Sequence, residues 1–152
     1  MRFFDTNILV YAATDQDVRK GAIARELISH ALTVNHDGCI STQVLSEFAN
    51  TMMGKQHHDK ESVDGFLDYF RELLATDVTI DLVRRAMVVK EEYGLQFYDA
   101  LIVATASKLG CHEIVSEDLN PGQTYCGMAV VNPFGAGVYP FFECGNASHP
   151  HG

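Results

Sequence analysis

Apolar and polar residues alternate between two kinds of segment along the chain. Five short apolar runs predict buried strands, at residues 2–4, 39–40, 78–80, 114–115 and 129–131. Between them, apolar residues recur at the three- and four-residue spacing of amphipathic helices. Strands that alternate with helices form parallel sheets covered by helices. The pattern therefore predicts an α/β fold, a three-layer α/β/α sandwich around a central, mostly parallel sheet.

Polar residues indicate where the predicted helices begin. Asn7 is expected to cap a short first helix, which would leave Asp5 free for another role. Ser41 or Thr42 is expected to cap a later helix, and Asp59 the one after it. The predicted helices lie at about residues 8–13, 15–32, 42–54, 60–74, 81–92 and 97–109.

The composition is that of a single domain. With 152 residues, 47% of them hydrophobic, the chain can bury one core. Residues 1–134 are expected to form this domain, and residues 135–152, rich in glycine, proline and aromatic residues, an irregular tail. No apolar run approaches the roughly 18 residues of a membrane span, and the acid at position 5 is unlike a secretory signal. A cytoplasmic location without membrane contact is therefore expected.

The charge of the chain bears on which ligands it can bind. A net charge of −9 does not favour strong, non-specific binding to phosphates, which needs lysine and arginine. An acidic protein can still act on RNA if bound divalent cations invert the local field. Four basic residues are candidates for holding RNA phosphates: Lys55, Arg84, Arg85 and Lys90.

The cysteines do not indicate a zinc site. Cys39, Cys111, Cys126 and Cys144 are widely separated and lack the close spacing of zinc ligands. In a reducing compartment they are expected to remain thiols, as small buried or half-buried side chains.

Two acidic residues follow predicted strands. Asp5 comes directly after the strand at residues 2–4, and Asp118 ends the Ser-Glu-Asp triplet that follows the strand at residues 114–115. Ligand sites of parallel sheets form beyond the carboxyl ends of the strands, so both side chains are expected at one edge. The alternatives are a helix cap for Asp5 and a plain loop for residues 116–118.

Two further acids lie within predicted helices. Glu47 falls near the apolar side of its helix, and Asp99 is the one charge in a mostly apolar segment, residues 95–104. A carboxylate in apolar surroundings costs free energy unless it is paired or bound to a metal. The alternatives are that Glu47 lies at the solvent edge of its helix and that Asp99 is a first-turn acid favoured by the helix dipole.

Together these acids suggest a metal centre. If Asp5, Glu47, Asp99 and Asp118 converge, their charges repel one another, and bound cations relieve such repulsion. Oxygen ligands of this kind suit Mg²⁺ or Mn²⁺ rather than zinc or copper. Serine, threonine and asparagine side chains can fill the remaining positions or hold metal-bound water.

Five motifs, in order along residues 1–134, resemble a known family. They are FFDTNIL from residue 3, STQVLSE from residue 41, YDALIVATA from residue 98, IVSEDL from residue 114 and VVNPF from residue 130. Each is weak alone, but in this order they resemble the PIN domain, the nuclease fold of VapC-type toxins of bacterial and archaeal toxin–antitoxin pairs. The resemblance implies a parallel sheet flanked by helices and a metal-dependent endoribonuclease that hydrolyses RNA phosphodiester bonds with Mg²⁺ or Mn²⁺.

The resemblance also implies which acids form the centre. Asp5, Glu47 and Asp99 match the three acids that the family shares, and Asp118 matches a fourth, variable one. In the mechanism that follows, one ion is held chiefly by Asp5 and Asp99 and activates water. A second ion, near Glu47 and Asp118, stabilises the leaving oxygen. Whether one or two ions act is left open.

Supporting residues and partners follow from the same resemblance. Asn7, more than Thr6, matches the polar residue that supports the first acid, and Ser116 matches a frequent serine or threonine. Toxins of this type pair with an antitoxin whose basic or aromatic segment enters the acidic groove, and they form homodimers through helices. The negative charge of the chain suits a positively charged partner.

Two other functions are alternatives. One is a non-catalytic nucleic-acid-binding or interaction protein that kept the fold, against which the complete set of acids speaks. The other is a haloacid-dehalogenase-like phosphatase, which also begins with an apolar strand and an Asp nucleophile. Those phosphatases carry a second Asp two residues later, where this chain has Asn7.

Overall fold

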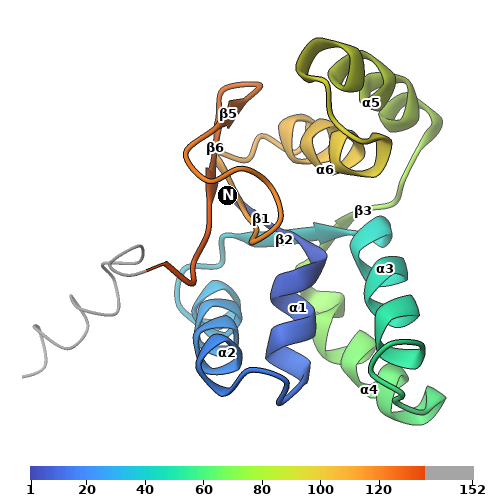
Figure 1. The fold of residues 1–152 in the computed structure, drawn as a ribbon, viewed down its shortest axis with the longest axis vertical. Coiled ribbons are helices and arrows are strands. Elements are labelled where there is room, and N and C mark those ends of the chain that lie inside the picture. Colours follow the sequence, from blue (N-terminus) through green and yellow to red (C-terminus); the bar gives the residue numbers. More distant parts are fainter. Residues whose placement is uncertain (136–152) are drawn as a thin grey trace, which may run out of the picture.

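A sheet between two layers of helices organises the chain (Figure 1). The computed structural model describes residues 1–135. The strands are β1 (Arg2–Phe4), β2 (Gly38–Ser41), β3 (Leu74–Thr76), β4 (Glu113–Val115), β5 (Thr124–Tyr125) and β6 (Met128–Val131). The helices are α1 (Thr6–Ala13), α2 (Val18–Thr33), α3 (Thr42–Met53), α4 (Lys60–Phe70), α5 (Ile80–Tyr93) and α6 (Phe97–Lys108), with a 3₁₀ turn at Arg71–Leu73.

Within residues 1–135 the strands form one mixed sheet in the spatial order β3-β2-β1-β4-β6-β5. β1 pairs in parallel with β2 and β4, β2 with β3, and β4 with β6, whereas β5 runs antiparallel to β6. The predicted α/β fold with a mostly parallel sheet is confirmed. β1 lies in the middle, so the residues that follow β1 and β4 meet at one edge of the sheet.

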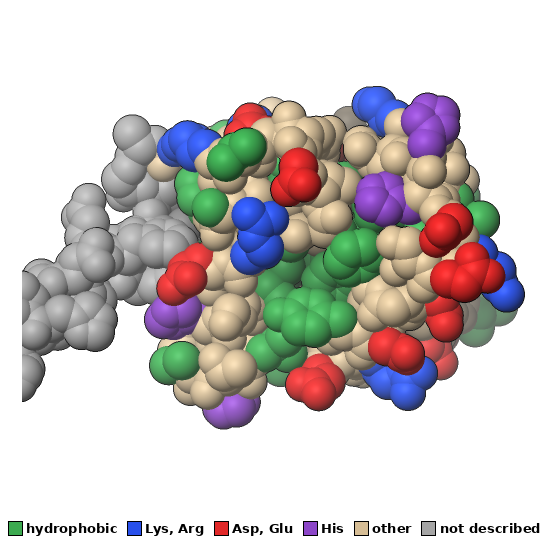
Figure 2. All heavy atoms as spheres, turned by 90° about the horizontal axis from the view of Figure 1, so that it is seen from below, with side chains coloured by type: hydrophobic (Ala, Val, Ile, Leu, Met, Phe, Trp, Pro, Cys, Tyr) green, Lys and Arg blue, Asp and Glu red, His purple; other side chains and the backbone are tan. Residues whose placement is uncertain are grey.

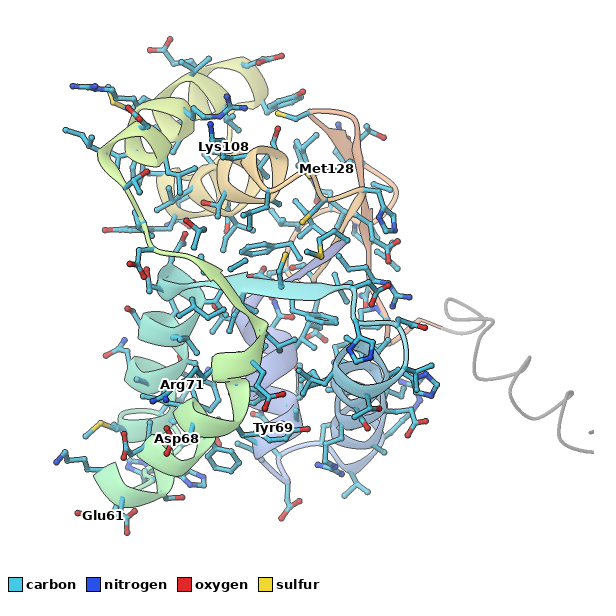
Figure 3. All side chains as sticks on the ribbon, turned by 180° about the vertical axis from the view of Figure 1, so that it is seen from behind. Glu61, Asp68, Tyr69, Arg71, Lys108 and Met128 are labelled. Carbon is cyan, nitrogen blue, oxygen red and sulfur yellow. The ribbon has the colours of Figure 1, made fainter. Side chains whose placement is uncertain are left out.

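The helices form two outer layers. α1 to α4 cover one face of the sheet, and α5 and α6 cover the other (Figure 1). All residues of α6 from 100 to 106 are buried, as expected of a helix that is apolar all round. Figure 3 labels Met128, a buried residue of β6. It also labels Asp68 of α4 and Arg71 just after it, whose charged side chains are exposed on the surface of the α1–α4 layer.

The prediction of a third strand at residues 78–80 is wrong. Its β-branched residues favour a strand locally, but the structure places the strand earlier, at Leu74–Thr76, where the sequence predicted the end of a helix. Thr79 instead caps α5, its hydroxyl accepting a hydrogen bond from the amide of Leu82. The amide of Val78 donates to the hydroxyl of Thr42 in α3. The conformation of residues 78–80 is therefore set by the helix cap at Thr79 and by this bond to a neighbouring helix.

The predicted cap of the first helix is also wrong. α1 begins at Thr6, and its N-cap is Asp5, whose carboxylate accepts a hydrogen bond from the Thr6 amide. Asn7 therefore lies inside the helix, and its side chain is directed to the segment after β4. Asp5 is at once a helix cap and a member of the candidate site, two roles that the sequence interpretation had set apart.

The other predicted boundaries agree with the structure to within a few residues. The runs at residues 2–4, 39–40, 114–115 and 129–131 lie within β1, β2, β4 and β6, while the short β5 was not predicted. Asp59 caps α4, as predicted. Ser41 occupies the N-cap position of α3 without making a capping hydrogen bond.

The described cysteines are thiols, as expected. Cys39 and Cys111 are buried, as expected, with their Sγ atoms 3.4 Å apart, whereas Cys126 is exposed, contrary to the expectation of a buried or half-buried side chain. Cys144 and all but the first residue of the predicted tail, 135–152, lie outside the described residues. None of the helices in residues 1–135 is both long and apolar enough to cross a membrane.

The outer face of the α1–α4 layer carries an apolar groove of about 640 Å³. Figure 2 shows this face, with hydrophobic side chains gathered in its centre between charged and polar rims. Ala12, Ile28, Phe66 and Tyr69 line the groove, which runs between α2 and α4. Apolar surface of this extent often marks a protein-interaction site.

The packing of β2 against β1 and α2 predicts a steric effect at Gly38. A Cβ atom there would lie 2.6 Å from the Phe4 ring and 2.7 Å from the Cβ of Ala31, both buried. We expect Gly38→Ala to reduce the free energy of unfolding by about 1–3 kcal/mol, as overpacked cores do. Urea unfolding followed by circular dichroism measures this.

Gly65→Ala is the matched control for that measurement. In α4, a Cβ at Gly65 meets nothing within 4 Å. Alanine also has the higher helix propensity, so this variant should be as stable as the parent or more stable by about 0.5–1 kcal/mol. Equal stability of the Gly38→Ala variant and the parent would contradict the packing described here.

Candidate active site

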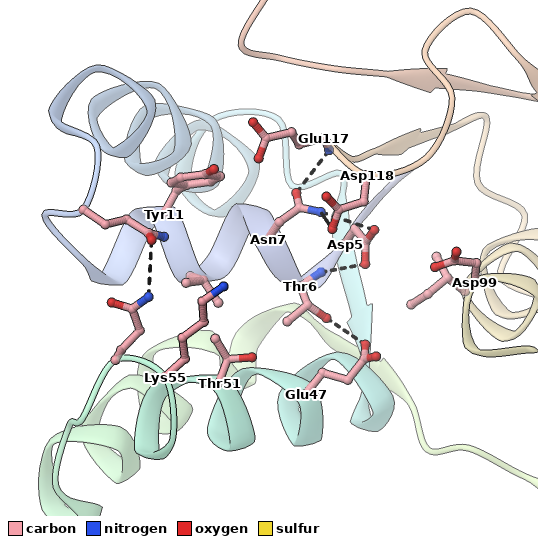
Figure 4. A pocket seen from close by; sticks show the side chains of 14 residues that line it. Asp5, Thr6, Asn7, Tyr11, Glu47, Thr51, Lys55, Asp99, Glu117 and Asp118 are labelled. Atoms are coloured by element: carbon pink, nitrogen blue, oxygen red, sulfur yellow. Dashed lines mark hydrogen bonds between the residues drawn. The ribbon is translucent and has the colours of Figure 1, made fainter. Parts of the chain in front are cut away.

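A cleft of about 370 Å³ opens at the carboxyl ends of β1 and β4 (Figure 4). The four acids predicted from the sequence all line it: Asp5, Glu47, Asp99 and Asp118. They come from the end of β1, from α3, from α6 and from the loop after β4. Residues separated by up to 113 positions (118 − 5) thus share one cavity.

Asp5 is the most enclosed of the four acids. Its side chain lies at the start of α1, and the residue is 7% exposed. One carboxylate oxygen accepts a hydrogen bond from the Thr6 amide at 2.8 Å. The other accepts one from the Ser116 hydroxyl at 2.7 Å. These bonds hold the carboxylate in one orientation at the floor of the cleft.

Ser116 and Asn7 join the first acid to the loop after β4. The buried Ser116 hydroxyl donates to Asp5 and accepts from the amides of Asp118 and Leu119, at 3.1 and 3.2 Å. The Asn7 amide nitrogen donates to the Asp118 carboxylate at 3.0 Å (Figure 4). Its carbonyl oxygen accepts from the backbone amide of Glu117. Asn7 and Ser116, two of the three predicted supporting residues, therefore position the loop that carries Asp118.

Glu47 approaches the cleft from α3. The Thr6 hydroxyl donates to its carboxylate at 2.8 Å (Figure 4), so Thr6 supports Glu47 rather than Asp5 with its side chain. Thr51 and Lys55 follow Glu47 at intervals of four residues and line the same cleft. One face of α3 and the turn after it thus run from a carboxylate to an ammonium group along the cavity.

Asp99 faces the other acids from the opposite side of the cleft. It lies in the first turn of α6, as predicted, and is half-buried. In Figure 4 its carboxylate points toward Asp5 and Asp118 across an open space. The alternative interpretation of Asp99, as an acid in the first turn of a helix, is confirmed, and such an acid can face a cavity at the same time.

Burial and mutual repulsion shift the titration of these acids. Burial, with a smaller contribution from the charges of Glu47 and Asp118, raises the pKa of Asp5 to about 6, although the hydrogen bonds from Ser116 and Thr6 lower it. Burial is also the main cause of the raised pKa values of Glu47 and Asp99, and the charge of Asp118 adds to both shifts. The site therefore disfavours its own negative charge, which a bound cation would compensate.

The donor set fits a divalent cation that keeps part of its water shell. All four acids offer oxygen, the ligand that Mg²⁺ and Mn²⁺ prefer. Among residues 1–135, however, no three carboxylate, imidazole or thiol groups converge closely enough to hold one ion together. Mg²⁺ usually binds one or two carboxylates directly and keeps several waters, so the open space between Asp99 and Asp5 is compatible with this ion.

Several residues of the cleft were not predicted as part of the site. Glu117, inside the motif that suggested Asp118, forms an ion pair with Lys20 beside the Tyr11 hydroxyl. Gln16 and Gln56 meet through their side-chain amides at the far end of the cleft. Thr51 could have been predicted from the sequence, because it follows Glu47 by four residues and therefore lies on the same face of the helix. The contacts of Lys20 and Gln16 are tertiary and left no pattern in the sequence.

Of the four basic candidates, Lys55 alone lines the cleft. Arg84 pairs with Asp81 on the exposed surface of α5. Arg85 lies beside Ser107, and Lys90 donates to the carbonyl of Leu95. The three residues of α5 therefore do not contribute to this site.

A parallel sheet with acids gathered beyond its central strands defines a class of α/β proteins that bind ligands at this edge. The family model of the PIN domain matches residues 2–124. The chain belongs to the PIN-domain family, as its motifs had indicated. A search of curated protein sequences gave no match.

Solved structures with the same fold include proteins of toxin–antitoxin pairs. The VapC20 toxin of Mycobacterium tuberculosis, described as cleaving the sarcin-ricin loop, has a TM-score of 0.59 and 21% identity, over 78% of this chain and 92% of that chain. A toxin–antitoxin complex from Klebsiella pneumoniae has a TM-score of 0.60 and 20% identity, over 88% and 98%. VapBC2 of Rickettsia felis, bound to a promoter DNA fragment, has a TM-score of 0.57 and 20% identity, over 85% and 96%.

At these identities the structural similarity shows the fold and not the activity. The family match leaves the haloacid-dehalogenase-like phosphatase without support, because the chain carries a different domain.

The raised pKa of Asp5 predicts how stability depends on pH. In the folded protein the pKa is about 6, against an ordinary value of 3.8. Between these values the folded chain keeps a proton that the unfolded chain has released. The contribution of Asp5 to stability is therefore fully present below pH 3.8 and is lost as the pH rises through about 6.

Asp5→Asn removes this titration. With a chelator present, the free energy of unfolding of the parent should fall relative to that of the variant between about pH 4 and about pH 7, by at most about 3 kcal/mol. Urea unfolding of both proteins across this range measures the difference. A constant difference at all pH values would mean that Asp5 titrates normally.

Proposed function

We propose that the protein is a metal-dependent endoribonuclease that hydrolyses RNA phosphodiester bonds. The observation that carries this proposal is the gathering of Asp5, Glu47, Asp99 and Asp118 around one cleft, with oxygen atoms as the donors. Membership of the PIN-domain family supports it. The same set of acids argues against a non-catalytic binding protein. Carboxylates gathered in one cleft repel one another, and this repulsion costs free energy unless a bound cation neutralises it.

In this proposal the four acids would hold Mg²⁺ or Mn²⁺, one or two of them by direct contact and the others through waters of the ion. A bound divalent cation supplies charge that polarises the phosphoryl group and lowers the pKa of a water molecule. Ser116 and the Thr6 amide hold Asp5 in place, the Thr6 hydroxyl orients Glu47, and the Asn7 amide orients Asp118. The role of these residues is to position the acids.

Lys55 binds a phosphate of the RNA beside the reacting one. It lines the cleft about two helical turns along from Glu47, and no ion pair to it is found within residues 1–135. An ammonium group at this distance lies clear of the acids and can attract the RNA backbone into an otherwise negative cavity.

We further propose that the enzyme is the toxin of a toxin–antitoxin pair and acts in the cytoplasm. The solved structures of similar fold include such toxins and their complexes. The net charge of −9 and the acidic cleft suit a partner segment with positive charge. The apolar groove between α2 and α4 offers the antitoxin a second, hydrophobic contact.

A homodimer is part of the same proposal. Ile80, Met87 and Val88 are exposed on α5. Their spacing of seven and eight residues puts them on one stripe of the helix. Covering this stripe with a second copy would remove apolar surface from water.

Cleavage of RNA tests the proposed activity. The parent should cut a labelled single-stranded RNA with Mg²⁺ or Mn²⁺ and stop when a chelator is added. Asp5→Asn and Glu47→Gln should each lower the rate by at least about 100-fold while remaining folded, since each removes a charged ligand. Asp81→Asn, at an acid on α5 whose side chain is 83% exposed, is the control and should cut like the parent.

The outcomes separate the two candidate functions. RNA binding without cleavage under any of these metals would favour the non-catalytic alternative. Cleavage that persists unchanged in the Asp5→Asn variant would place the active site elsewhere.

Lys55→Ala tests the phosphate contact. Because the side chain is exposed and contributes binding rather than chemistry, KM should rise about 3- to 10-fold with little change in kcat. The slope of log KM against log salt concentration should also decrease. Lys108→Ala, at an exposed lysine in the opposite layer (Figure 3), is the control and should change neither value.

A further inference from the structure

A second hollow, of about 430 Å³, adjoins the acidic cleft, and we call it the side pocket. It lies between α3, the loop before α5 and the start of α6. Glu47 lines both cavities, so a ligand that fills the cleft at Glu47 is in reach of the side pocket. No part of the proposed hydrolysis uses this space.

The walls of the side pocket are largely apolar. Val78 and the buried Leu101 form part of them, and the ring of Tyr98 stands at the rim, 58% exposed. Tyr98 directly precedes Asp99 in α6, and its side chain lines the side pocket whereas that of Asp99 lines the cleft. A large aromatic side chain left in water beside an apolar hollow offers a stacking surface.

Hydrogen bonds keep the side pocket in shape. The Gln43 side chain, on a residue 7% exposed, donates from Nε2 to the carbonyl of Tyr98 at 3.0 Å and so ties α3 to α6. The Thr42 hydroxyl accepts from the amide of Val78, which fixes the loop. The Oε1 atom of Gln43 has no hydrogen-bond partner among the described residues, an uncommon state for a buried amide.

We propose that the side pocket binds a nucleobase of the RNA, from a nucleotide next to the phosphodiester that is cut, with the Tyr98 ring stacked on the base. This inference rests on the proposed function for the location of the phosphodiester. Bases have flat apolar faces, which match the Tyr98 ring and the largely apolar walls of the side pocket. Single-stranded RNA is commonly held by such stacking.

Charge favours the base over the other parts of a nucleotide. Glu47 stands where the two cavities join, and a phosphate in the side pocket would lie beside its carboxylate without a basic residue to compensate. A neutral base meets no such repulsion. The phosphates then follow α3 in the other direction, past Thr51 to Lys55.

Fluorescence gives a direct test of binding. The sequence contains no tryptophan, so Tyr98→Trp introduces a single reporter at the rim of the side pocket. We expect a single-stranded RNA of about ten nucleotides, mixed rapidly with the variant and Mg²⁺, to quench this fluorescence by stacking. An abasic ribose-phosphate chain of equal length should leave it unchanged. Tyr69→Trp, at a tyrosine 51% exposed on α4, is the matched control and should not respond.

Kinetics give a second test. Tyr98→Ala should raise KM for RNA about 10-fold with kcat within about 2-fold of the parent, because stacking contributes to binding. Tyr98→Phe keeps the ring and should restore the parent KM. The same RNA with one base removed beside the cut should lose affinity for the parent and not for the Tyr98→Ala variant.

The outcomes distinguish this inference from the proposed function. Cleavage by the parent, with no quenching by RNA or with equal quenching by the abasic chain, would contradict base binding in the side pocket and would leave the proposed nuclease activity supported. Base-dependent quenching without cleavage supports the side pocket and overturns the nuclease. A fluorescence change that grows with protein concentration in the absence of RNA would show that a second copy of the protein covers this surface, and would contradict base binding.

Discussion

The hydrogen bond from the Ser116 hydroxyl to the Asp5 carboxylate joins the ends of two neighbouring strands and keeps an acid enclosed at the edge of the sheet. The parallel pairing of β1 with β4 brings these residues together across 111 positions of sequence. The same hydroxyl accepts two backbone amides of the following loop. Because the loop is held in this way, Asp118 stands within reach of the Asn7 side chain. The floor and one wall of the cleft thus depend on a single buried serine.

An enclosed carboxylate is a liability for the fold. Burial raises the pKa of Asp5, and the neighbouring acids raise it further, so the folded chain holds a charge that its surroundings disfavour. The Thr6 amide at the start of α1 and the Ser116 hydroxyl offset part of this penalty. A site that remains electrostatically unsatisfied after its hydrogen bonds are made is suited to a cation, and strain of this kind is expected where stability is given up for function.

α3 and the turn that follows it organise the cleft along its length. Glu47, Thr51 and Lys55 line it at successive four-residue intervals, so its electrostatic character changes from acidic to basic along one element. At the acidic end Glu47 also borders the side pocket beneath Tyr98. In our proposals the substrate strand therefore follows α3, with a base at one end, the reacting phosphodiester beside the acids and a further phosphate near Lys55.

The sequence alone determined the fold class and four of the five acids that line the cleft, the exception being Glu117. Apolar periodicity is local, and acids that follow strands or interrupt apolar helices are visible in one dimension, which is how Asp5, Glu47, Asp99 and Asp118 were found. Only the tertiary structure decided that Asp5 caps α1, that residues 78–80 lead into a helix, and that Lys20 pairs with Glu117. The cap of α1 is a local bond between Asp5 and Thr6, whereas the last two outcomes involve contacts between distant segments, the Val78–Thr42 hydrogen bond and the Lys20–Glu117 ion pair. Such contacts compete with local propensity and leave no periodic pattern in the chain.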